Sequence, residues 1–354
     1  MDIRALIKQE VLGQKAYAVD PASCRIKLDA NENPLAMPAE LRPRFAARLA
    51  AVELNRYPEA GSVALAARFA RAFGVGADQV MLGNGSDELI QVLCTALARP
   101  GAGVMIPTPT FAMYRITALN AGFRVAEVPL DDSFDLDLAA MRAQAGAQPP
   151  ALTFLAYPNN PTANCFSAER IGSLLREAAG IVVVDEAYFH FAQQTFLPEL
   201  GRRENLVILR TLSKVGLAAM RIGLLIGPAP LVREHNKVRL PYNLNSLSQA
   251  AAGFYLDEEE AFLEQAAKIR RWRGELTTAM ETLPGIRVRP TDANFVFFSC
   301  DFDADRVYTG LKERGILIKN FNAPGRLKGF MRVTVGTPEE NNEFAEALRS
   351  ILTE

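Results

Sequence analysis

Two residues with complementary chemistry follow two apolar runs of this chain. Lys214 lies in the stretch LVILRTLSKVGLAAMRIG, after an apolar run and seven residues before a second cation, Arg221. Asp185 follows the apolar run 181–184, and Tyr188 comes three residues later. Such continuous apolar runs are typical of buried strands, so we expect the carboxylate and the lysine to leave the ends of neighbouring strands of one sheet.

These groups match the needs of pyridoxal 5'-phosphate (PLP). The cofactor requires an amine that holds it as a Schiff base, an acid that keeps its pyridinium nitrogen protonated, and donors for its phosphate. Lys214 and Asp185 supply the first two. Each alone has an ordinary explanation, because most lysines are exposed and many aspartates cap turns or helices. Their joint occurrence favours the cofactor, with phosphate donors at Thr211, Ser213 and Arg221.

The composition limits the class of protein. The chain has 354 residues, more than one typical core needs, so we expect a large domain with a smaller partner. The net charge is −1 and the 39 Lys and Arg residues are scattered, which gives no electrostatic case for nucleic acid. Neither a signal peptide nor a transmembrane run is indicated. We therefore expect a cytoplasmic protein that does not bind membranes.

Metal and hydrolytic chemistry are not indicated. With two histidines, His190 and His235, a Ser-His-Asp hydrolase or a His-rich metal site is not expected. The cysteines lie far apart and form no CxxC motif, so neither a disulfide framework nor a zinc site is predicted. We expect buried thiols at Cys24, Cys94, Cys165 and Cys300.

A glycine turn follows the apolar run 80–82. Gly83 and Gly85 precede a helix that is expected to start near Ser86. The backbone N–H groups of such a turn can bind a phosphate, although helix capping by Ser86 explains the pattern without a ligand. The turn matches neither the dinucleotide fingerprint nor the GxxxxGK[ST] loop.

Two more loops could contact a cofactor. Phe111, in a Pro-rich loop, could stack on a flat ring or fill the core. Asn160 follows the apolar run 152–156 and could donate to a phenolate oxygen or simply form a turn. In an open parallel sheet, ligands bind at the edge where such loops leave the strands.

The order of elements predicts an α/β fold. Strands alternate with helices from about residue 78 to 227, and the segment 241–251 leads into one long amphipathic helix that ends near Leu283. We expect a mostly parallel large-domain sheet flanked by helices, plus a smaller α+β domain. The predicted domains are a large PLP-binding domain at 30–245 and a small domain with an N-terminal arm at 1–29 and 246–354.

Taken together, the motifs resemble the histidinol-phosphate aminotransferase family. They are LDANENP, NRYPEAG, GNGSDE, the Pro-Thr-Phe loop, PNNPTA, DEAYFHF, TLSK with Arg221, and MRVTVGTPEEN, and they span essentially the whole chain in unbroken order. The resemblance implies a fold-type I PLP transferase that forms a homodimer with shared active sites. It implies transamination between L-glutamate and imidazole-acetol phosphate, with histidinol phosphate and 2-oxoglutarate as the other pair, in histidine biosynthesis.

The same motifs also fit other functions on this scaffold. A threonine-phosphate decarboxylase or an aminotransferase for aromatic or aliphatic amino acids would share every cofactor residue. A regulatory or binding module is disfavoured, because a pure binding role has no use for the Schiff-base lysine Lys214 opposite an acid.

The resemblance also implies roles for cofactor-binding residues. Lys214 would hold the cofactor and move the proton, and Asp185 would pair with the ring nitrogen. Asn160 and Tyr188 would donate to the phenolate oxygen, and Phe111 would stack on the ring. The phosphate would be bound by Ser86, Asp87, Thr211, Ser213, Arg221 and, from the other subunit, Tyr57.

The substrate residues depart from the family in one respect that matters. Arg332 would bind the anionic end of the substrate, aided by Asn33, and Tyr17 would belong to a flap over it. Lys319 stands where many members have an arginine near the substrate phosphate, and a lysine cannot make the bidentate contact of a guanidinium. Two smaller departures are Phe111, where tyrosine is frequent, and Ala163, where glycine is usual.

Overall fold

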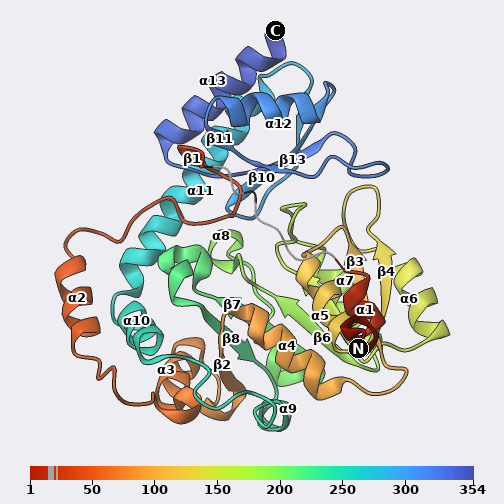
Figure 1. Ribbon diagram of the computed structural model, residues 1–354, viewed down its shortest axis with the longest axis vertical. Coiled ribbons are helices and arrows are strands. Elements are labelled where there is room, and N and C mark those ends of the chain that lie inside the picture. Colours follow the sequence, from red (N-terminus) through yellow and green to blue (C-terminus); the bar gives the residue numbers. More distant parts are fainter. Residues whose placement is uncertain (15–19, 21–22) are drawn as a thin grey trace.

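The apolar runs of the sequence form the middle of a seven-stranded sheet. The computed structural model describes residues 1–14, 20 and 23–354 (Figure 1). The strands lie in the order β2-β8-β7-β6-β5-β3-β4. β8 is antiparallel to both of its neighbours and the other pairs are parallel, which confirms the expected mostly parallel sheet. The bounds are β2 (Val80–Asn84), β3 (Gly103–Thr108), β4 (Arg124–Pro129), β5 (Leu152–Ala156), β6 (Ile181–Asp185), β7 (Leu206–Thr211) and β8 (Ile222–Ile226).

Both faces of this sheet are buried. Val182 and Val184 of β6 belong to one apolar core, whereas Val183 between them belongs to a second core. This alternation explains the continuous apolar run, because successive side chains of a strand enter opposite faces. The helices in this part of the chain are α3 (Val63–Phe73), α4 (Ser86–Leu97), α5 (Ala112–Asn120), α6 (Leu138–Ala147), α7 (Ala168–Glu177), α8 (Phe189–Ala192) and α9 (Ala229–His235).

A second, four-stranded sheet lies above the first in Figure 1. Its order is β12-β13-β10-β9, and every pair is antiparallel. A separate parallel pair joins β1 near the N-terminus to β11. The elements are β1 (Ile26–Lys27), β9 (Ile286–Val288), β10 (Phe295–Cys300), α12 (Ala304–Glu313), β11 (Ile316–Leu317), β12 (Lys319–Asn320), β13 (Phe330–Thr334) and α13 (Pro338–Thr353).

The single long helix expected up to Leu283 is instead two helices. α10 (Ser246–Asp257) and α11 (Glu259–Glu281) meet at Glu258, whose backbone is not helical. Four consecutive acidic side chains surround this point, and their repulsion is relieved when two of them begin a new helix, where the dipole favours negative charge. Arg48 and Arg68 also hold Asp257 at the end of α10.

α10 packs on the helices of the large sheet. Its partners α2 (Arg42–Ala50) and α3 contribute Arg48 and Arg68, and Phe45 meets Phe254 at 5.2 Å between ring centroids.

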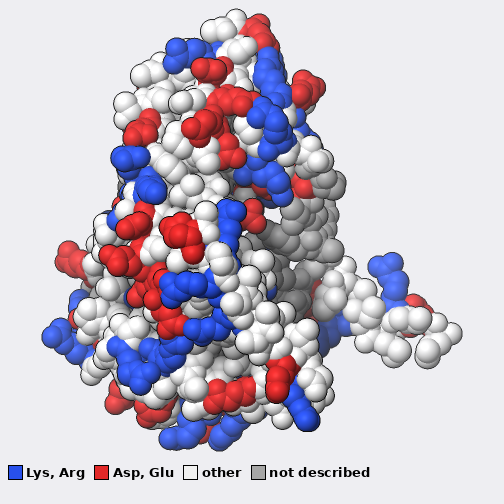
Figure 2. Space-filling view, turned by 90° about the vertical axis from the view of Figure 1, so that its left-hand side faces the viewer, with Lys and Arg blue, Asp and Glu red and all other residues white. Residues whose placement is uncertain are grey.

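Figure 2 shows basic and acidic side chains intermixed on one face of the molecule. The domain boundaries at residues 30 and 245 stay a prediction. The remaining elements are η1 (Ile3–Leu6), α1 (Gln9–Leu12), η2 (Ala60–Ser62), η3 (Ala77–Gln79), η4 (Leu197–Arg202), η5 (Ser213–Leu217) and η6 (Ala218–Met220).

Two local predictions need correction. Gly83 does not belong to a turn, because it pairs with Gly223 inside β2, and Gly85 alone of the two adopts a positive φ, +79°. The thiols of Cys94 and Cys300 are buried as expected, but those of Cys24 and Cys165 are only half-buried. Among the described residues, no helix is both long and apolar enough to cross a membrane.

Candidate active site

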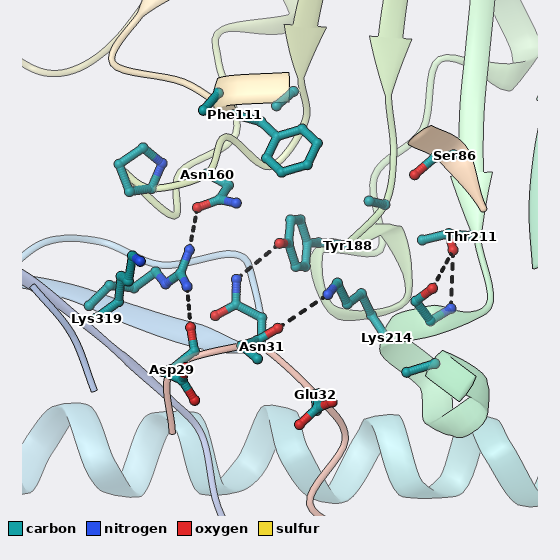
Figure 3. Close-up of a pocket in the computed structure, with 18 of the residues that line it drawn as sticks. Asp29, Asn31, Glu32, Ser86, Phe111, Asn160, Tyr188, Thr211, Lys214 and Lys319 are labelled. Atoms are coloured by element: carbon teal, nitrogen blue, oxygen red, sulfur yellow. Dashed lines mark hydrogen bonds between the residues drawn. The ribbon is translucent and has the colours of Figure 1, made fainter. Parts of the chain in front are cut away.

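A cavity of about 860 Å³ lies between the large sheet and the small sheet (Figure 3). Its floor is formed by residues at the carboxyl ends of β5, β6 and β7, and β12 and β13 contribute to the opposite wall. This is the sheet edge at which an α/β fold binds ligands. The cavity brings together twelve predicted site residues: Ser86, Asp87, Phe111, Asn160, Asp185, Tyr188, Thr211, Ser213, Lys214, Arg221, Lys319 and Arg332.

Asp185 is the last residue of β6 and is almost fully buried. Tyr114 donates its hydroxyl to Oδ2 at 2.7 Å, and the backbone N–H of Ala187 donates to Oδ1 at 3.1 Å. Burial raises the pKa of Asp185 to about 6, although both hydrogen bonds act in the opposite direction. Above that pH, Asp185 is a buried carboxylate that can accept a hydrogen bond from a further donor.

Lys214 lies in η5, the irregular helical turn that follows β7. Its Nζ donates to the carbonyl oxygen of Ala30 at 3.3 Å. Burial, with the nearby Arg332 guanidinium as the second cause, lowers the pKa of Lys214 to about 8. A larger fraction of this amine is therefore neutral near pH 8 than in an ordinary lysine, as a nucleophile or a general base requires.

The backbone at the start of α4 is held close to β8. A Cβ atom on Gly223 would lie 2.4 Å from the carbonyl carbon of Gly85 and 2.5 Å from the nitrogen of Ser86. A Cβ atom on Gly85 would lie 2.7 Å from a terminal nitrogen of Arg221. Glycine at both positions therefore lets the first N–H groups of a twelve-residue helix face the cavity beside a guanidinium.

Side-chain donors complete this end of the cavity. The hydroxyl of Thr211 donates to that of Ser213 at 2.9 Å, and Arg221 donates to the carboxylate of Asp87 at 3.1 Å. Arg221 has a φ of +52°, in the left-handed region, which turns the chain between η6 and β8. Hydroxyls, a guanidinium and helix N–H groups at one point suit a phosphate.

A second cationic group lies on the opposite wall. Arg332 of β13 is buried and donates to Oδ1 of Asn160 and to the carbonyl oxygen of Asp29, both at 2.5 Å. Its guanidinium also lies over the rings of Phe295 and Phe321, at 5.2 and 5.5 Å from their centroids. Lys319 of β12 pairs directly with Arg332 across the antiparallel ladder. Two adjacent cations suit an anionic group of a substrate.

Two polar side chains lie between these ends. Tyr188 accepts a hydrogen bond from Nδ2 of Asn31 at 3.0 Å. Asn160 accepts from Arg332 through Oδ1, so its amide nitrogen is the end that can donate into the cavity.

Two of the predicted residues that the structure describes, Asn33 and Tyr57, do not line this cavity. Among the described residues that line it, Asn31 is present and Asn33 is not. The amide of Asn33 donates instead to Val215 and to Gln265, at 3.2 and 2.9 Å. Tyr57 is 81% exposed and stacks on Tyr242 at the surface. Tyr17 lies outside the described residues.

Asn31 and Tyr114 also line the cavity, although the sequence pattern did not predict them. Tyr114 lies three residues after Phe111, so a helix that starts at Ala112 brings both toward one side, and this spacing could have identified it. Asn31 has a φ of +55°, a conformation that asparagine tolerates better than most residues. The motif LDANENP contains two asparagines, and spacing alone could not tell which one faces the cavity.

Comparison with known proteins identifies the family. Residues 25–348 match the family described as aminotransferase class I and II. The chain belongs to the class I and II aminotransferases. The aminotransferase is 44% identical over 347 residues to histidinol-phosphate aminotransferase 2 of Nitrosococcus oceani, which covers 97% of this chain and 96% of that protein. At this identity and coverage it is a member of the histidinol-phosphate aminotransferase family.

Solved structures share the fold of the aminotransferase. Histidinol-phosphate aminotransferase from Sinorhizobium meliloti, in complex with pyridoxal-5'-phosphate, superposes with a TM-score of 0.89 at 22% identity, over 98% of this chain and 97% of that chain. L-threonine-O-3-phosphate decarboxylase from Porphyromonas gingivalis superposes with a TM-score of 0.79 at 22% identity, over 93% and 100%. Both likenesses confirm the fold-type I architecture.

We expect Lys214 to react as a neutral amine at a lower pH than an ordinary lysine. In the cofactor-free protein, its acetylation by acetic anhydride should reach half of the maximal rate near pH 8, because its pKa is lowered to about 8. Peptide mass spectrometry at each pH measures this rate, and N-acetyl-lysine amide, which titrates at about 10.4, is the reference. Arg332→Gln should move the midpoint of Lys214 upward. A midpoint equal to that of the reference would contradict the expectation.

Proposed function

We propose that this aminotransferase binds PLP in the cavity and transfers an amino group between L-glutamate and imidazole-acetol phosphate, as a cytoplasmic step of histidine biosynthesis. One observation carries the proposal: Lys214, with its lowered pKa, and the buried Asp185 line the same cavity. The identity to histidinol-phosphate aminotransferases supports the choice of substrates.

The residues present fit PLP. The hydroxyls of Thr211 and Ser213, with Arg221 and the helix start at Ser86, match the cofactor's phosphate. Asp185 matches the ring nitrogen, since a buried carboxylate makes a charge-assisted bond to an N–H donor. When bound, PLP supplies a conjugated ring that accepts the electrons released at the substrate carbon.

Each of these side chains would have a distinct role in the reaction. Lys214 would link to the cofactor and then, released by the substrate amine, carry a proton to and from the substrate carbon, for which a pKa of about 8 is suitable. Tyr188 and Asn160 would donate to the phenolate oxygen from two sides. Phe111 would cover one face of the ring and exclude water, a role that needs an aromatic face and not the hydroxyl of the more frequent tyrosine.

Arg332 and Lys319 would bind the substrate's anionic end. Glutamate and histidinol phosphate use one pocket in turn, so a cation there must accept a carboxylate in one half-reaction and a phosphate in the other. A rigid guanidinium can pair with two oxygens of either group. Lys319 would add a point charge, which favours the more highly charged phosphate.

The decarboxylase alternative is less well supported. The likeness to threonine-phosphate decarboxylase shows the fold alone, because the identity is 22%. The relatives at 40 to 44% identity over nearly the whole chain are histidinol-phosphate aminotransferases.

The direct test is an assay of the purified, PLP-loaded protein. With histidinol phosphate and 2-oxoglutarate we expect glutamate to form, and with threonine phosphate we expect no release of carbon dioxide. Lys214→Ala should abolish glutamate formation, because no other amine is then placed to link to the cofactor. Carbon dioxide release from threonine phosphate, without glutamate formation in the first assay, would overturn the proposed substrate assignment.

Lys319→Gln should weaken the histidinol phosphate half-reaction more than the glutamate half-reaction. Loss of one charge-assisted contact costs about 1.5–3 kcal/mol, or roughly ten- to a hundredfold in affinity. Single-turnover titration with each substrate measures this difference. Arg332→Gln is the matched comparison and should weaken both half-reactions. Equal losses for both substrates in Lys319→Gln would show that Lys319 does not discriminate phosphate.

Tyr57 is proposed to contact the cofactor phosphate of a second subunit. It stacks on Tyr242 with ring centroids 4.6 Å apart, and both rings are exposed. The neighbouring side chains Leu54 and Leu240 are 78% and 70% exposed. Such an apolar group of surface residues is typical of a contact with another chain, and it supports the homodimer that the family resemblance implies.

If sites are shared, two inactive variants should complement one another. In a heterodimer of Tyr57→Ala and Lys214→Ala chains, one of the two sites contains both intact residues, so activity should exceed that of either parent. Mixed-tag purification isolates the heterodimer, and the glutamate assay measures its activity. Heterodimers of Tyr242→Phe and Lys214→Ala chains provide the control for subunit exchange. An inactive Tyr57–Lys214 heterodimer would contradict the shared site.

A further inference from the structure

A buried tyrosine hydroxyl contacts the acid of the proposed cofactor site. Tyr114, on α5, is 1% exposed and donates to Oδ2 of Asp185 at 2.7 Å. The two residues come from different elements, 71 positions apart in the sequence. The contact therefore depends on the packing of α5 against the sheet.

Neighbouring rings fix the direction of this hydroxyl. The ring of Tyr114 stacks on Phe154 of β5, with centroids 4.8 Å apart and an interplanar angle of 4°. It also meets Phe111 edge to face, at 5.5 Å and 85°. Phe111 is the residue proposed to cover the cofactor ring, so Tyr114 contacts both the proposed stacking face and the proposed acid.

The hydrogen bond from Tyr114 affects the ionisation of Asp185. Burial alone favours the protonated acid, as do the nearby carboxylates of Asp87 and Glu186. The donors that oppose them are Tyr114 and the backbone N–H of Ala187. Burial also raises the pKa of Tyr114 well above its ordinary value, so this phenol keeps its proton and remains a donor.

We propose that Tyr114 is a positioning residue whose hydroxyl keeps Asp185 ionised and correctly oriented, so that the proton between Asp185 and the cofactor stays on the ring nitrogen. A carboxylate that loses a donor becomes more basic and competes better for that proton. The inference rests on the proposed function, because it concerns how Asp185 meets PLP. It goes beyond that function by assigning a role to a residue outside the predicted set.

Tyr114→Phe tests this, because it removes the hydroxyl and retains the ring that packs on Phe154. The enzyme is loaded with PLP labelled with nitrogen-15 in the ring, and nitrogen NMR reports whether that nitrogen is protonated. We expect a protonated nitrogen in the unaltered enzyme and a shift toward the neutral form in Tyr114→Phe. A purely structural role for Tyr114 would not move this signal.

Tyr157→Phe is the matched control. Tyr157 is also a buried tyrosine beside the end of β5, but its hydroxyl donates to Gln194 at 2.6 Å and it is not among the described residues lining the cavity. This variant should leave the nitrogen signal unchanged. The glutamate half-reaction should slow about tenfold in Tyr114→Phe with little change in KM, since the hydroxyl that is removed contacts Asp185.

The outcomes separate the two proposals. An unaltered enzyme that binds no PLP would overturn the proposed function and this inference together. If the unaltered enzyme has a protonated ring nitrogen and Tyr114→Phe has the same signal and the same rate, only the inference on Tyr114 fails. A shift of equal size in Tyr157→Phe would also overturn the inference.

Discussion

The parallel pairing of β6 and β7 sets the geometry of the whole site. Their register places Asp185 opposite Leu209, so the acid and the Thr211–Lys214 segment leave the sheet side by side. In addition, Nε and Nη2 of Arg210 donate to Oε2 of Glu186 at 3.0 and 2.9 Å, and both side chains are buried. This ion pair joins the residue after Asp185 to the residue before Thr211. Removing one partner of such a pair typically costs about 3–5 kcal/mol, so the two strand ends are firmly held.

Electrostatics then couple the two walls of the cavity. Arg332, on the small sheet, lowers the pKa of Lys214, on the large one, and it also donates to Asn160. An anion bound at Arg332 would offset that positive charge and allow the pKa of Lys214 to rise. Anion binding at Arg332 and the proton affinity of the lysine would therefore be linked through one guanidinium.

The sequence predicted the features that depend on local pattern. Continuous apolar runs identified β5, β6 and β7, and the polar residues after them identified Asp185 and Lys214. Features that depend on tertiary packing were beyond it. Helical periodicity continues across Glu258, so the break between α10 and α11 was not visible. The choice between Asn31 and Asn33 depends on a positive φ, and the contact of Tyr114 with Asp185 depends on how α5 packs.

The two central groups of the site lower the stability of the empty protein near neutral pH. The pKa of Lys214 is about 8 when folded and near 10.4 in an unfolded chain, so the unfolded chain binds more protons between these values and stability rises with pH across that window. The pKa of Asp185 is raised to about 6, so stability falls as pH rises toward 6. At pH 7 both charged forms are therefore disfavoured by the fold. A ligand that reacts with the amine and offers the carboxylate a proton donor would relieve both costs at once, as PLP is proposed to do.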